Sequence, residues 1–365
     1  MSEHRGAPEG AEASTKREPT ADSGDRSVPR TGSSGPEMTT QESEGGVPSL
    51  FMQRLGKGLL RNSLVIVLVL VAVAFSIMNP AFASLQNMVT LGIELSAIAL
   101  ITFGQTGVLL TAGIDLSVGN IIGLAGVVGA LALVAGQSFP VAFLMAACTG
   151  VVVGMVNGLL VAYLNIPAFI VTLGTGSATL SMAYILSAGE PVMSANGAFL
   201  ALTTQSILGV PIVAWLMLII FLLWWLILER TPFGTYVYAI GGNPMAARLA
   251  GVNTRKITMI VYIVSGLLAA VAGMIMASEA TAGIATTGSS QTLTSIAGAV
   301  IGGVSLFGGR GRLWGAAVGV LLITVLINGM AVLNVSEFYQ GLASGTLIIL
   351  AVFMDALYRR LYGES

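Results

Sequence analysis

The sequence predicts an all-α, polytopic membrane protein of about ten transmembrane helices with a disordered N-terminal tail. Three observations predict this class. Hydrophobic residues make up 55% of the chain and charged residues only 9%, whereas charged residues make up about a quarter of an average soluble domain. Apolar segments of about 20 residues, the length that crosses a bilayer as a helix, follow one another from residue 63 onward. Residues 1–50, by contrast, contain no long apolar run.

The tail is the first predicted region. It carries nine of the 17 acidic residues, from Glu3 to Glu44, among many Ser, Thr, Gly and Pro residues. Such a composition buries too little apolar surface to offset the entropy lost on folding. The tail also lacks the apolar core of a signal peptide. We therefore expect a disordered cytoplasmic tail at 1–50 and a transmembrane domain at 51–365, anchored by an uncleaved first apolar segment.

The transmembrane domain is predicted to contain ten spans. Proline, glycine and polar clusters mark the boundaries between its apolar segments. The predicted spans are 63–79, 88–111, 117–135, 140–163, 168–188, 211–228, 257–278, 292–308, 313–333 and 338–357.

Basic residues predict the orientation, because short cytoplasmic loops carry an excess of Lys and Arg. In a ten-span chain every basic residue from Arg54 onward falls on one side, and the other side holds the acids Glu190, Glu279 and Glu337. We expect both termini to be cytoplasmic and the longest external loop to lie at about 189–210. The turn that holds Asp115 is then expected to face the cytoplasm.

The composition excludes several kinds of chemistry. The single histidine, His4, lies in the tail and the single cysteine, Cys148, lies in an apolar span, so we expect neither a His-based metal site nor a disulfide framework. The sequence contains no G-x-x-x-x-G-K-[ST] motif, so no ATP is expected to bind through a P-loop. Neither a catalytic cluster nor a nucleic-acid-binding motif is visible, and no cofactor is expected.

Glycine spacing predicts close helix packing. The chain has 46 glycines. Several recur four residues apart within spans, at 119 and 123, at 150, 154 and 158, at 298 and 302, and at 315 and 319. Small residues on one helix face let two backbones approach closely. The turns at 111–123 and 307–319 also share their glycine spacing, either as the remnant of an internal repeat or by chance in a Gly-rich chain.

A short polar helix is predicted between two spans, where residues 241–252 read GGNPMAARLAGV. Asn243 is a good N-cap, Pro244 suits the first helical position, and Gly251 suits a left-handed C-terminal cap. A helix of about two turns is not stable alone in water, so it needs a partner surface. The alternative is an interfacial helix that rests on lipid headgroups.

Five motifs carry a family resemblance. They are GIDLSVG (113–119), PAFIVTLGT (167–175), TPFGTYVYAIGGNPMAARLAGV (231–252), VIGGVSLFGGRGR (300–312) and SEFYQG (336–341). In this order they resemble the permease subunits of bacterial ABC sugar importers of the ribose/xylose/arabinose type. That branch belongs to the superfamily that includes branched-chain amino-acid permeases. The likeness covers most of the transmembrane domain.

The resemblance implies a transport subunit, not an enzyme, that moves a monosaccharide such as ribose or xylose across the bacterial inner membrane into the cytoplasm. It implies a dimer with a second permease copy or a paralogue, two ATPase subunits that bind the ATP, and a periplasmic or lipid-anchored sugar-binding protein. Within the coupling loop 229–256 it implies a coupling helix seated on the ATPase. The implied contact residues are Asn243, Pro244, Met245, Ala246, Ala247, Arg248, Leu249 and Gly251.

Two departures from the family pattern leave the substrate open. Met245 stands where relatives often carry an acidic residue. Residues 291–296 read QTLTSI, where relatives often read Tyr-Glu-Leu-x-Ala-Ile. The loss of these acids bears on the identity of the sugar and on the details of ATPase pairing.

Polar side chains inside the spans are the candidates for the translocation path, because such groups are costly in lipid. They are Gln105, Asp115, Asn120, Asn157, Thr172, Thr175 and Asn328. The alternative is that they bridge neighbouring helices, and Glu94 is expected to reach the outer surface. Two other functions stay open: an ABC permease for an amino acid, nucleoside or autoinducer, and an ion-coupled secondary transporter.

Overall fold

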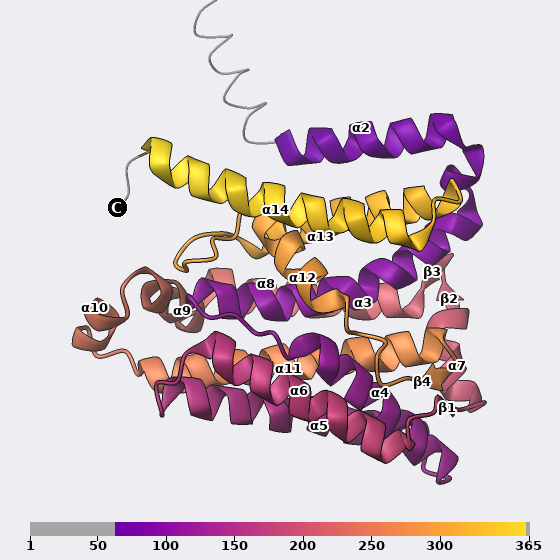
Figure 1. Ribbon diagram of the computed structural model, residues 1–365, viewed down its shortest axis with the longest axis horizontal. Coiled ribbons are helices and arrows are strands. Elements are labelled where there is room, and N and C mark those ends of the chain that lie inside the picture. The colour runs from indigo at the N-terminus through magenta and orange to yellow at the C-terminus, as the bar shows by residue number, and fades with distance from the viewer. Residues whose placement is uncertain (1–62, 363–365) are drawn as a thin grey trace, which may run out of the picture. The chain divides into compact units, whose positions relative to one another are not determined.

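The computed structural model describes residues 63–362, which form a bundle of helices (Figure 1). The predicted disordered tail at 1–50 lies outside the described residues. Each of the ten predicted spans corresponds to a helix. These are α2 (Ser63–Met78), α3 (Leu85–Leu110), α4 (Val118–Val134), α5 (Phe139–Ala162), α6 (Ala168–Ser187), α8 (Ile212–Arg230), α11 (Thr254–Glu279), α12 (Gln291–Ile301), α13 (Leu313–Val332) and α14 (Glu337–Tyr362).

Six helices of the described range are long and apolar enough to cross a membrane, namely α3, α5, α6, α8, α11 and α13. Helices α2, α4 and α12 are apolar but shorter. The predicted all-α, polytopic membrane class is confirmed. Local signals set several helix starts: the side chains of Ser84 and Asn253 accept hydrogen bonds from backbone N–H groups in the first turns of α3 and α11, as N-caps do.

Short elements lie at the two ends of the bundle. One end holds η1 (Pro80–Ala83), α7 (Gly197–Thr204), and two small antiparallel sheets, β1 (Val192–Met193) with β4 (Ala282–Gly283) and β2 (Ser206–Ile207) with β3 (Val210–Pro211). Leu208 and Gly209 form the β2–β3 turn with φ of 56° and 78°, which suits a tight hairpin. The other end holds α9 (Pro232–Gly242) and α10 (Pro244–Leu249).

Glycine lets the helices pack backbone to backbone, as its spacing predicts. A Cβ added at Gly150 would meet the backbone of Gly266, and one added at Gly154 would meet the backbone of Tyr262. These contacts join α5 to α11. The pairs at 298 and 302 and at 315 and 319 pack against each other in the same way and join α12 to α13. Any side chain at these positions would push the helices apart.

The chain leaves α3 by a segment that turns back into the bundle before α4 begins (Figure 1). Ala112 starts this segment with a positive φ of 59°, and residues 113, 115 and 117 are buried. An irregular backbone is tolerated at such a place only when protein groups satisfy its polar atoms. Asp115 itself has no exposed surface, so its carboxylate lies inside the bundle and not on the surface of a turn. The side of the membrane that this segment faces stays a prediction.

Helix α12 starts against the beginning of α4. The backbone N–H of Gly119 donates to Thr292 Oγ1 at 3.0 Å, and a Cβ at Gly123 would meet the backbone of Ala285. The segment that precedes α12 thus packs on the glycine face of α4. Helix α12 has only 11 residues, about 16 Å at 1.5 Å per residue.

The predicted span 292–308 is therefore too long at its C-terminal end. Helix α12 ends at Ile301, and Gly303 follows with a φ of 85°. About 16 Å is roughly half of a 30 Å hydrocarbon core. Helix α12 is thus a half-helix. It spans the hydrocarbon core only together with the irregular chain at both of its ends.

Two exposed leucines at opposite ends of α8 provide a test of orientation. Leu208, in the β2–β3 turn, is 90% exposed, and Leu249, on α10, is 82% exposed. In a Cys148→Ser background, Leu208→Cys should react with an impermeant maleimide applied to intact cells, and Leu249→Cys should react only after the membrane is opened. Labelling of Leu249→Cys from outside would reverse the predicted orientation.

Candidate functional site

Helix α10 is held by the predicted caps. Asn243 Oδ1 accepts a hydrogen bond from the Ala246 N–H at 2.9 Å, and Pro244 occupies the first turn. Gly251 follows with a φ of 84°, and the Val252 N–H donates to the Ala247 carbonyl at 3.1 Å. The two ends of this short helix are therefore fixed by their own sequence, as expected for a segment that is presented to another surface.

The exposed face of α10 is apolar at its centre. Met245 is 62% exposed and Leu249 is 82% exposed, and Ala246 and Arg248 are exposed beside them. Ala247 differs from the expectation, because it is buried within this chain and only 5% exposed. Ala247 therefore packs α10 against the rest of this chain and offers no surface to a partner. The exposed ridge consists of Met245, Ala246 and Leu249.

Helix α9, which leads into α10, contacts the end of α3 through a glycine. The N–H of Gly309 donates to the Leu110 carbonyl at 3.0 Å. Gly241, at the end of α9, packs against both of these backbone atoms, and the Tyr238 hydroxyl donates to the Gly311 carbonyl at 3.0 Å. The turn after α3 and the turn after α12 are thus neighbours, and α9 rests on both.

A buried polar cluster surrounds Asp115. Its Oδ1 accepts hydrogen bonds from the Ser117 N–H at 3.0 Å and the Ser117 hydroxyl at 2.6 Å. Its Oδ2 accepts from the Ser265 hydroxyl of α11 at 3.0 Å. The Gln105 side chain, oriented so that donors face acceptors, pairs with the backbone N–H and carbonyl of Asp115. These bonds satisfy the irregular backbone between α3 and α4.

The cluster continues to α5 and α6. Asn157 Nδ2 donates to Ser117 Oγ at 2.8 Å, and its Oδ1 accepts from the Thr175 hydroxyl at 2.6 Å. Thr172 Oγ1 donates to the Ile114 carbonyl at 3.2 Å. Five of the seven predicted path residues therefore meet here through hydrogen bonds to one another or to the same segment. Asn120 lies nearby and donates to the Gly176 carbonyl at 3.0 Å.

Asn328 lies apart from that cluster and belongs to a pocket. Its Nδ2 donates to Glu94 Oε2 at 3.3 Å, and its Oδ1 accepts from Asn87 Nδ2 at 2.8 Å. Glu94 is partly buried within the bundle and lines a cavity of about 390 Å³. Asn328 thus positions a carboxylate at a cavity wall. Glu94 keeps part of its surface exposed, so its expected reach to the outer surface stays a prediction.

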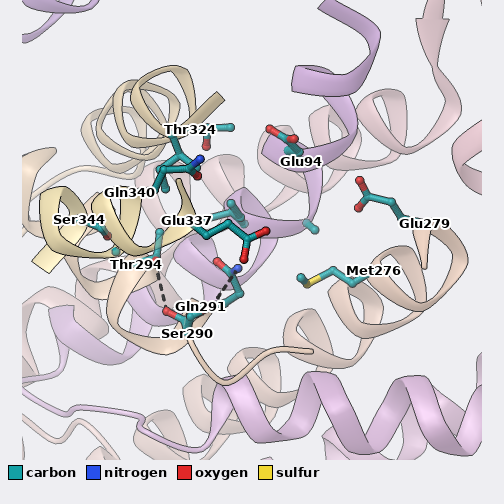
Figure 2. A pocket seen from close by; sticks show the side chains of 14 residues that line it. Glu94, Met276, Glu279, Ser290, Gln291, Thr294, Thr324, Glu337, Gln340 and Ser344 are labelled. Carbon is teal, nitrogen blue, oxygen red and sulfur yellow. Dashed lines mark hydrogen bonds between the residues drawn. The ribbon is translucent and has the colours of Figure 1, made fainter. Parts of the chain in front are cut away.

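The pocket lies between α3, α11, α12, α13 and α14, and most of the residues that line it have polar side chains (Figure 2). Three carboxylates line it, from Glu94, Glu279 and Glu337. Gln291 and Gln340 add amides, and four hydroxyl groups come from Ser290, Thr294, Thr324 and Ser344. Ala97, Ile98, Met276 and Ile327 complete the wall with apolar surface. Such a mixture of apolar wall and few convergent polar groups is typical of a small-molecule site.

Comparisons with known proteins decide the family. The sequence matches the family described as "Branched-chain amino acid transport system / permease component" over residues 87–352. The chain belongs to this family. The predicted family resemblance is confirmed, and the chain is the permease component of a transport system rather than an enzyme.

The permease is similar to several sugar permeases over most of its length. It is 37% identical to the ribose import permease protein RbsC of Haemophilus influenzae, over 83% of this chain and 95% of the relative. It is 39% identical to RbsC of Bacillus subtilis, over 83% and 93%. It is 36% identical to the L-arabinose transport system permease protein AraH of Escherichia coli, over 80% and 89%. No solved structure matches the chain.

Several pocket residues of the permease escape prediction from sequence. Glu279, Glu337, Gln291 and Gln340 lie at or near helix ends, where polar residues are common at a membrane surface. Their sequence positions give no sign that α11, α12 and α14 bring them together around Glu94. One signal does point toward the pocket, because Gln291 opens the run in which this sequence departs from the family pattern.

Proposed function

We propose that this permease forms the membrane channel of an ATP-driven importer that carries a monosaccharide across the bacterial inner membrane into the cytoplasm. Its match to these sugar permeases covers nearly the whole length of each of them. A separate ATPase binds the ATP, a periplasmic or lipid-anchored binding protein delivers the sugar, and a second permease copy or a paralogue completes the dimer. Both termini are cytoplasmic.

The observation that carries the proposal is the exposed ridge of α10. Met245 and Leu249 present apolar surface on a helix that both caps and Ala247 hold in place. Apolar side chains on a rigid helix fit a hydrophobic groove, and here that groove belongs to the ATPase. The contact of Gly241 with Leu110 and Gly309 then carries a displacement of α10 to the end of α3.

Transport in this scheme is a shift between two arrangements of the bundle. ATP binding on the partner favours one arrangement because the partner contacts α10 differently in each. The two arrangements differ most at the irregular segment between α3 and α4 and at the half-helix α12. Neither is a continuous helix, so a change of conformation there costs little. The permease itself does no covalent chemistry.

The test is a bulky substitution on the ridge of α10. Ala246→Trp should insert into the membrane at the normal level, lower sugar uptake at least tenfold and weaken copurification of the ATPase, because overpacking a fitted contact costs about 1–3 kcal/mol. Leu208→Trp, at the other end of the bundle, is the matched control and should change neither quantity.

The alternative role of α10 predicts a different result. A helix that rests on lipid headgroups tolerates an added Trp, since Trp is favoured at the membrane interface. Normal uptake together with normal ATPase binding in Ala246→Trp would therefore contradict the proposed coupling role.

A further inference from the structure

The pocket around Glu94 lies beside a helix that spans only part of the bundle. It is lined by Ser290, Gln291 and Thr294, at the start of the half-helix α12. Thr292, in the same turn, accepts a hydrogen bond from the first turn of α4. Transporters often hold their solutes at such interrupted helices, because the backbone there is not fully used by helical hydrogen bonds. The pocket is thus built into the part of the bundle best suited to hold a solute.

We propose that this pocket is a solute site for a neutral, polyhydroxylated molecule and that its carboxylates exclude anionic solutes. The inference rests on the proposed function in one respect, because it takes the bound molecule to be the transported one. A cavity of about 390 Å³ falls within the range of about 300–1,000 Å³ that is usual for small-ligand sites. A single monosaccharide fits in such a volume.

Hydrogen-bond acceptors of the pocket match the hydroxyl groups of a sugar. Glu94 is oriented by the chain from Asn87 to Asn328 to Glu94, with distances of 2.8 Å and 3.3 Å. The carboxylate has a second oxygen, and a hydroxyl that donates to it forms a charge-assisted hydrogen bond, about twice as strong as a neutral one. Glu279 and Glu337 offer the same kind of acceptor at the exposed side.

Donors and apolar surface complete the match. Gln291 and Gln340 carry amides that both donate and accept, and α12 begins at Gln291 without a side-chain cap from Ser290. Ile98 and Met276 supply apolar wall for the C–H face of a sugar ring. A simple cation needs only acceptors, so the combination of donors, acceptors and apolar wall favours a polyol.

Charge gives the pocket its selectivity. Among the described residues that line it, three are acidic and none is basic. Acidic groups in a cavity with low-dielectric walls concentrate a negative potential and lower the local concentration of anions. A sugar acid or sugar phosphate therefore meets repulsion at Glu279 and Glu337 before it reaches Glu94. An amino acid would also have no basic side chain here to pair with its carboxylate.

The first experiment measures the charge selectivity of the purified full-length permease in lipid nanodiscs, without ATPase. In a Cys148→Ser background, Gln291→Cys is treated with a cationic and an anionic methanethiosulfonate of similar size. The ratio of the cationic to the anionic rate should be about tenfold higher at Gln291→Cys than at the exposed Leu208→Cys. Glu279→Gln with Glu337→Gln should bring the ratio close to that of Leu208→Cys, a control in the exposed β2–β3 turn. A ratio of the two rates at Gln291→Cys equal to that at Leu208→Cys would overturn the proposed charge selectivity.

The second experiment measures occupancy by protection of the same cysteine. D-ribose, L-arabinose or D-allose at high concentration should slow labelling of Gln291→Cys by both reagents and leave Leu208→Cys unaffected. D-ribonate, the anion of the sugar acid, should give no protection. Ser344→Cys, on the α14 wall, repeats the measurement in case the loss of the Gln291 amide weakens binding. Glu94→Gln should raise the half-protecting sugar concentration about tenfold, since a charge-assisted hydrogen bond becomes neutral.

The outcomes separate the solute site from the proposed function. No protection by any of the three sugars at either cysteine would overturn the site, and so would equal protection by ribonate. None of these measurements uses ATP or uptake. If sugars protect the cysteine but the importer does not move sugar, the proposed function fails and the site remains. If the importer moves sugar but sugars do not protect the cysteine, the site fails and the proposed function remains.

Discussion

Gly241→Ala is expected to reduce uptake at least tenfold, although it adds a single methyl group. A Cβ at this position would meet the Leu110 carbonyl and the backbone N of Gly309, and these two groups are bonded to each other at 3.0 Å. Backbone atoms cannot rotate away as a side chain does, so α9 must lift off the end of α3. The distortion costs about 1–3 kcal/mol and separates α10 from the bundle. Uptake and sugar-stimulated ATP hydrolysis by the complete importer measure the effect.

Gly242→Ala is the matched control for this substitution. Gly242 is the next residue of α9 and shares its helical conformation, but apart from its chain neighbours and the backbone of its own helix, no atom of the described residues lies within 4 Å of a Cβ placed there. Both variants carry the same change in helix propensity, so only the collision differs between them. Full uptake in Gly241→Ala, or equal losses in the two variants, would show that the contact with Leu110 and Gly309 does not transmit the motion of α10.

The sequence predicts features that depend on neighbouring residues. The ten helices follow from apolar length, and the caps of α10 follow from Asn243, Pro244 and Gly251. Glycines at four-residue spacing predict the close approach of α5 to α11 because spacing alone sets which residues share a helix face. Each of these signals lies within a stretch of about 20 residues.

Features that depend on distant contacts could not be predicted in this way. Asp115 has the flanking glycines of a surface turn, and only the contacts of its segment with α5, α6 and α11 place it inside the bundle. Ala247 lies on the same short helix as Ala246, and no periodicity over two turns shows which of them faces the chain. The end of α12 at Ile301 could not be predicted, because the apolar run of the sequence continues past Gly303.

The pocket is the largest difference between sequence and structure. Its carboxylates come from α3, α11 and α14, more than 50 residues apart along the chain. A sequence pattern assigns each acid to a surface or to a span but does not say which of them gather. Asn328 is the one predicted path residue that positions a pocket group, through its bond to Glu94. Five of the other candidates belong to the cluster around the segment between α3 and α4, and Asn120 joins α4 to α6.

Replacing Asp115 by alanine is expected to destabilise the permease more than any other single change in the buried cluster. The Ser117 N–H, the Ser117 hydroxyl and the Ser265 hydroxyl would lose their acceptor. Each buried donor left without a partner costs about 1–3 kcal/mol, and water does not reach this site, because Asp115 and Ser117 have no exposed surface. The yield of monodisperse protein and its melting temperature in detergent should both fall sharply.

Asp115→Asn separates a structural role of this residue from a role of its charge. The asparagine oxygen can still accept from Ser117, and its amide can donate to the Ser265 hydroxyl, which accepts as readily as it donates. The variant should therefore keep most of the melting temperature that alanine loses, and most of the uptake. A stable Asp115→Asn protein that has lost uptake would show that the negative charge itself takes part in transport. In that case the cluster would be part of the translocation path and more than a brace between α3 and α4.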